Sequence, residues 1–156
     1  MVDAPARPMS EIWFYHLERS ALEPVLADLL DRTLKRGWKA VVRSPDPQRI
    51  AQLDDLLWTY RDDSFLPHGR ADEPMAERQP ILLSTTEDRP NAADALFLLD
   101  GAELGALAGY ARRLYLFDGQ DEAQLVRARE RWREARGSGA AISYWRQTDQ
   151  GWEKQG

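Results

Sequence analysis

The stretch that decides the fold is residues 11–43, EIWFYHLERSALEPVLADLLDRTLKRGWKAVVR. It opens with an aromatic run, residues 12–15, of the kind found in strands. Leu26, Leu29, Leu30, Thr33 and Leu34 follow at spacings that place them on one face of a helix. Residues 39–43, centred on Ala-Val-Val, predict a second strand. Strand, helix and strand in this order predict a βαβ unit with a parallel pair.

Local signals predict where the helices begin and end. Residues 20–23, Ser-Ala-Leu-Glu, have the spacing of a capping box, and Gly37 is well placed to end the first helix. Asp46-Pro47 predicts the start of a second helix, with the aspartate as N-cap and the proline in the first position. A last helix is expected from about 121 to 136, before the glycines of residues 137–139.

The remaining segments continue the alternation of strands and helices. Residues 80–84 and 95–99 are uninterrupted apolar runs, which suit strands covered on both faces. Further strands are expected at 113–117 and 141–146, and a short helix at 104–108. We therefore predict a three-layer α/β/α sandwich with a mostly parallel sheet, Rossmann-like but without a dinucleotide motif. The expected organisation is a disordered end at 1–10, a single domain at 11–150 and a polar tail at 151–156.

Composition narrows the class of protein. The chain has 156 residues, six tryptophans, no cysteine and a net charge of −5. The missing cysteines exclude disulfides and thiolate chemistry, and the acidic balance argues against nonspecific coating of nucleic acid. No apolar run is long enough to cross a bilayer, and the first ten residues lack the apolar core of a signal peptide. A cytoplasmic protein is the expectation.

Motifs for catalysis and cofactor binding are missing. The chain has no G-x-x-x-x-G-K-[ST] loop, and no G-x-G-x-x-G follows the first strand, so no nucleotide cofactor is expected. His16 and His68 are the only histidines, and neither has further ligands at metal-binding spacing, so no metal is expected either. No catalytic residue is predicted. The alternative is a small-molecule enzyme that uses His16 at the end of the first strand.

The last helix carries a basic, aromatic face. Residues 127–136 contain five arginines and two glutamates, a local charge of +3 in an acidic chain. On a helical wheel, one sector of roughly 100° holds Arg129, Trp132, Arg133 and Arg136, and Leu125 extends the same face. Arginine beside an aromatic ring suits an acidic peptide that ends in an apolar residue. Two alternatives stay open: a buried Trp132 with solvated arginines, or direct binding of single-stranded DNA.

A second feature is Trp58, which lies roughly 120° from the leucine stripe of its helix. The loop after it, residues 61–80, contains Phe65, Pro67 and His68. Exposed large aromatics of this kind are typical of protein–protein anchors. The alternative is that the loop folds back and buries Trp58 and Phe65 beneath itself.

Together these features resemble the chi subunit of the bacterial DNA polymerase III holoenzyme. The resemblance runs over most of the chain: the aromatic first strand, Arg36-Gly37-Trp38, residues 53–58 followed by Ser64-Phe65-Leu66-Pro67-His68, Ala128-Arg129-Glu130-Arg131-Trp132, and Tyr144-Trp145. It implies an α/β fold and a non-catalytic accessory subunit in DNA replication. Such subunits link the clamp-loader complex to the acidic, Phe-terminated C-terminal tail of single-strand-binding protein, so contact with DNA is indirect.

The resemblance also implies roles for individual residues. Arg129 matches the family's tail-binding arginine, Trp132 its neighbouring aromatic and Arg133 the following basic residue. Leu125 stands where a basic residue is found in the well-studied form, and Arg127 points elsewhere on the wheel. Trp58 and Phe65 match a second surface used for the psi subunit, another clamp-loader component or a helicase.

Overall fold

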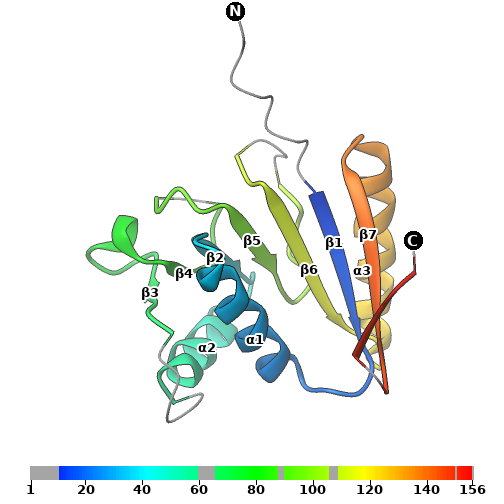
Figure 1. Cartoon of the computed structure of the whole chain (residues 1–156), viewed down its shortest axis with the longest axis horizontal. Coiled ribbons are helices and arrows are strands. Elements are labelled where there is room, and N and C mark those ends of the chain that lie inside the picture. Colours follow the sequence, from blue (N-terminus) through cyan, green and yellow to red (C-terminus); the bar gives the residue numbers. More distant parts are fainter. Residues whose placement is uncertain (1–10, 60–65, 88–89, 106–108, 150, 156) are drawn as a thin grey trace, which may run out of the picture.

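The structure, a computed structural model, describes residues 11–59, 66–87, 90–105, 109–149 and 151–155. It contains an eight-stranded sheet in the order β3-β4-β2-β5-β6-β1-β7-β8 (Figure 1). The strands are β1 (Glu11–Leu17), β2 (Ala40–Arg43), β3 (Gly69–Arg70), β4 (Ile81–Ser84), β5 (Ala95–Leu98), β6 (Arg112–Asp118), β7 (Ala141–Thr148) and β8 (Gly151–Lys154). Neighbouring strands are parallel throughout, except that β8 runs antiparallel to β7.

Three helices cover the two faces of this sheet. α1 (Leu22–Lys35) and α2 (Pro47–Thr59) lie on one face and α3 (Glu122–Gly137) on the other (Figure 1). Strand β1 supplies both cores because its side chains alternate: Tyr15 packs with the leucines of α1 and α2, and Phe14 packs on the side of α3. The predicted three-layer sandwich with a mostly parallel sheet is confirmed.

The two strands of the predicted βαβ unit are parallel but not neighbours. Strand β1 pairs with β6 and β7, whereas β2 pairs with β4 and β5. Strands β5 and β6 therefore lie between them. Central strands with apolar side chains on both faces can pair with many partners, so the sequence of residues 11–43 predicts the unit and not its place in the sheet.

Most predicted helix ends are confirmed. Gly37 follows α1 with a φ of +87°, and its N–H donates to the carbonyl of Leu34 at 2.9 Å. Asp46 caps α2 by accepting from the N–H of Gln48 at 3.0 Å. Asp121 caps α3 by accepting from the N–H groups of Ala123 and Gln124.

The predicted capping box at residues 20–23 is wrong. Helix α1 begins after Ala21, and no side chain caps it. The Ser20 hydroxyl accepts instead from the Gln147 side-chain amide at 2.8 Å. The Gln147 side-chain oxygen in turn accepts from the backbone N–H groups of Glu18, Arg19 and Ser20. A long-range partner from β7 therefore replaces the local cap.

The C-terminal residues join the sheet. The segment expected as a polar tail contributes β8, and Trp152 from that strand packs edge-on against Tyr15 with ring centroids 5.0 Å apart. Of the short helix expected at 104–108, Leu104 and Gly105 are not helical and 106–108 lie outside the described residues. Among the described helices, none has the length and apolar character that a membrane crossing needs.

Candidate functional site

One flank of α3 presents the basic, aromatic face that the sequence predicts. Arg129, Arg133 and Arg136 are exposed, and within the described part of the chain none of the three forms an ion pair. Trp132 is partly buried, edge-on to Phe14 at 5.1 Å and to Tyr144 at 5.4 Å between ring centroids. The tryptophan is therefore anchored in the core while still reaching the surface. Leu125 packs against the same cluster.

The other two arginines of the cluster lie on the opposite flank of α3. Arg131 is buried and donates to the carbonyls of Gly101 at 3.0 Å and Ala102 at 3.2 Å. Arg127 lies against the same turn, since a Cβ placed on Gly101 would be only 2.5 Å from its Cδ. We call the five residues on the other flank the α3 face: Leu125, Arg129, Trp132, Arg133 and Arg136.

Sequence reasoning missed the residues that support this face. Tyr144 of β7 packs on Trp132, and its hydroxyl lies 2.6 Å from Nδ1 of His16. The Nε2 atom of His16 lies 3.1 Å from the Glu18 carboxylate, which Arg146 holds at 2.7 Å. Burial raises the pKa of Tyr144 and lowers the pKa of His16. The sequence pointed to Tyr144 only through the strand expected at 141–146 and the Tyr144-Trp145 segment of the resemblance.

His16 stands where an α/β enzyme would place a ligand. Strands β1 and β6 are neighbours, and their connections leave through helices on opposite faces of the sheet, which makes this edge a topological switch point. The His16 ring fills the place: a Cβ on Gly119 would lie 1.9 Å from its Nε2. The imidazole is thus packed against the turn, and its Nδ1 is hydrogen-bonded to the Tyr144 hydroxyl.

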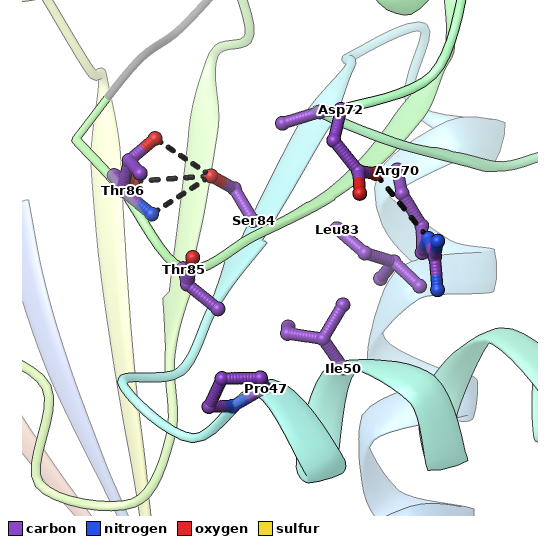
Figure 2. Close-up of a pocket in the computed structure, with 9 residues that line it drawn as sticks. Pro47, Ile50, Arg70, Asp72, Leu83, Ser84, Thr85 and Thr86 are labelled. Atoms are coloured by element: carbon purple, nitrogen blue, oxygen red, sulfur yellow. Dashed lines mark hydrogen bonds and ion pairs between the residues drawn. The ribbon is translucent and has the colours of Figure 1, made fainter.

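A cavity of about 360 Å³ lies at the carboxyl ends of β3 and β4, beside the first turns of α2 (Figure 2). Its ionisable lining residues are Arg70 and Asp72, which pair with each other at 3.3 Å. The Ser84 hydroxyl is engaged with Thr86. No histidine lines the cavity, and its one carboxylate, Asp72, is already paired with Arg70. No group of three potential metal-ligating side chains occurs among the described residues.

Trp58 forms a second exposed aromatic surface at the end of α2. It is 54% exposed, as its place on the helical wheel predicts. His68 packs beneath it with ring centroids 4.6 Å apart. The side chain of His68 has no exposed area, so it supports Trp58 rather than offering contact area of its own. Its Nε2 lies 2.9 Å from the Asp54 carboxylate, and its Nδ1 lies 2.8 Å from the Leu66 carbonyl.

The loop after Trp58 is partly described. Pro67 is half-buried and Leu66 is buried in the core beneath α2. Phe65, predicted to join this surface, lies outside the described residues. We call Trp58 and Pro67, with His68 as their support, the Trp58 surface.

The fold and these surfaces define an α/β sandwich with two exposed aromatic sites, one of them basic. Residues 9–143 match the protein family described as DNA polymerase III chi subunit, HolC, and the chain belongs to this family. It is 24% identical over 99 residues to a probable DNA polymerase III subunit chi of Rickettsia prowazekii, covering 64% of this chain and 60% of that protein. It is 26% identical over 107 residues to DNA polymerase III subunit chi of Pseudomonas aeruginosa, covering 67% and 74%.

Proposed function

We propose that the protein is a non-catalytic, cytoplasmic accessory subunit of the replicative DNA polymerase. In this role it links the clamp-loader complex to single-strand-binding protein. The α3 face binds the acidic, Phe-terminated tail of single-strand-binding protein, and the Trp58 surface binds a second component of the replication machinery. Family membership supports the assignment to the polymerase, and the geometry of the two surfaces supports the division of roles.

The observation that carries the proposal is the pairing of an anchored tryptophan with unpaired arginines on the α3 face. Trp132 is held edge-on by Phe14 and Tyr144, so its orientation is set before a ligand arrives. Arg129 and Arg133 are exposed one helical turn or less from it and have no acidic partner among the described residues. A tail carboxylate can pair with these guanidinium groups while an apolar end group packs on the ring.

The test compares two arginines of one helix. Arg129→Ala removes a cation from the α3 face, whereas Arg127→Ala removes one from the opposite flank. We expect Arg129→Ala to weaken binding of the tail peptide about tenfold, within the roughly 1–3 kcal/mol of a charge-assisted contact, and Arg127→Ala to leave it nearly unchanged. Fluorescence anisotropy of a labelled peptide measures both. Equal losses would show that general charge, and not the α3 face, holds the tail.

Leu125 stands at the position where the resemblance implies a basic residue. Arg127 lies on the other flank of α3, against Gly101, and cannot substitute for it without leaving that contact. The tail then meets an apolar residue at this point. Leu125→Lys is therefore expected to strengthen tail binding, most clearly at low salt, because it adds a cation beside Arg129. An unchanged affinity at low salt would mean that the tail does not pass over residue 125.

Direct binding of single-stranded DNA is the competing reading of the α3 face. A thymidine oligonucleotide titrated under the same conditions distinguishes the two. Steeply salt-dependent binding of the oligonucleotide, with no dependence of peptide binding on the terminal Phe, would replace the proposal. The edge-on packing of Trp132 against two neighbouring rings is the arrangement of an anchored side chain rather than of an open stacking platform.

A further inference from the structure

A cavity of about 270 Å³ lies on the face of the sheet that carries α1 and α2, opposite to α3. It opens between the last turns of α1 and the amino ends of β1, β5 and β6. Two tryptophans and three arginines dominate its lining. They are Trp13, Trp38, Arg32, Arg36 and Arg112. We call this the Trp13–Trp38 pocket, and neither proposed surface includes any of its residues.

Guanidinium groups and indole rings interleave in this pocket. Arg112 lies over Trp13 with its Cζ 3.8 Å from the ring centroid, and the same Cζ is 5.3 Å from the centroid of Trp38. Arg36 covers Trp38 at 4.1 Å. Cations at these distances are attracted by the faces of the rings, which holds the arginines in place without neutralising them.

The charge of the pocket is only partly compensated. No acidic residue lines it. Arg112 pairs with Glu11 at 3.0 Å, and Arg32 pairs with Asp28 at 3.3 Å. Arg36 has no acidic partner among the described residues. The pocket is therefore a basic cluster with one unpaired arginine, on a chain whose net charge is −5.

We propose that the Trp13–Trp38 pocket is a third docking site, for an acidic segment of a partner protein. A carboxylate of the segment pairs with Arg36, and a neighbouring apolar side chain enters the cavity beside Leu29 and Leu114. Nucleobases fit less well, because guanidinium groups already lie over one face of each indole. The proposal does not depend on the role of the α3 face.

The test measures the binding of an acidic peptide at individual tryptophans. Indole N–H signals are resolved by NMR and assigned with Trp13→Phe and Trp38→Phe. The probe is the blocked peptide acetyl-Asp-Glu-Phe-Asp-Glu-amide, which has an internal Phe and no terminal carboxylate. We expect the signals of Trp13 and Trp38 to shift and that of Trp132 to stay. Arg36→Gln should weaken this binding about tenfold, and the matched variant Arg129→Gln should not.

Several results would overturn the proposal. One is the absence of shifts at Trp13 and Trp38 up to millimolar peptide; another is a shift confined to Trp132, which would assign the acidic peptide to the α3 face alone. Equal binding of a peptide with lysine in place of each acid would show that charge plays no part. Shifts of Trp13 and Trp38 with a thymidine oligonucleotide but not with the peptide would assign the pocket to nucleic acid.

Discussion

Individual side chains explain how the α3 face is held. Trp132 touches the surface because Phe14 and Tyr144 stand edge-on beneath it, and Tyr144 is tied to His16 by a 2.6 Å contact between its hydroxyl and Nδ1. The histidine that the sequence left open as an enzyme residue therefore supports the α3 face, the proposed binding face. The sequence shows that residue 16 is a histidine. It does not show that Tyr144, 128 residues away, is the hydrogen-bond partner of His16.

The pH dependence of stability tests that support. Burial lowers the pKa of His16 below its ordinary value of 6.5, although the nearby Glu18 opposes the shift. The unfolded chain then binds a proton that the folded chain does not, so the contribution of His16 is complete above pH 6.5 and is lost as pH falls toward its folded pKa. Titration of the imidazole C–H signals by NMR measures the shift. A pKa at or above 6.5 would contradict it, and in His16→Gln this part of the pH dependence should disappear.

Substitutions at His68 and Trp58 compare a buried ring with an exposed ring of the Trp58 surface. His68→Ala removes a buried ring and leaves the Asp54 carboxylate unpaired, so we expect a loss of roughly 1–3 kcal/mol in the free energy of unfolding. Trp58→Ala removes a ring that is 54% exposed and should cost much less. Chemical denaturation measures both. A larger loss for Trp58→Ala would mean that the tryptophan is part of the core.

At the scale of elements, local chemistry predicted the helices and strands well where the partner is near in sequence. Asp46 and Asp121 cap their helices and Gly37 ends α1, because each signal acts within a few residues. The capping box failed because Gln147 competes for the backbone donors of residues 18–20. Strand β8 was missed because its residues 151–154 are mostly polar, and only Trp152 faces the core.

Gln147 should contribute more to the stability of the fold than its partly exposed position suggests. One side-chain oxygen accepts from three consecutive backbone N–H groups and joins β7 to the turn after β1. We expect Gln147→Ala to lower the free energy of unfolding by about 1 kcal/mol or more. Ser20→Ala, which keeps the three backbone bonds, should have a smaller effect. Equal losses in chemical denaturation would show that the Ser20 hydroxyl is the essential partner.

At the scale of the whole molecule, the sheet separates the surfaces. The layer order was predictable from alternating helices and apolar strands, but the strand order, with β5 and β6 between β1 and β2, depends on pairings that no local pattern encodes. Likewise, a helical wheel of α3 predicted which arginines share a face. The edge-on packing of Trp132 could not be predicted, because it depends on where β1 and β7 lie. The Trp13–Trp38 pocket joins residues from α1, the turn after it, β1, β5 and β6, which no local pattern brings together.

Two separate proposed faces imply independent binding. Trp58 is carried by α2 and the α3 face lies across the sheet, so Trp58→Ala should leave the affinity for the tail of single-strand-binding protein unchanged. It should abolish capture of the clamp-loader component or helicase that the other surface binds. Surface plasmon resonance with the immobilised tail peptide measures the first, and co-purification with the other replication proteins measures the second. Loss of both together would contradict separate faces.

We propose that the protein binds an acidic tail that ends in Phe. The most direct measurement is calorimetric titration of the purified chain with a short acidic peptide ending in Asp-Phe, at low and moderate salt, beside the same peptide without its terminal Phe. We expect binding that weakens as salt rises and disappears when the Phe is removed. No binding at either salt, or equal binding without the Phe, would contradict it.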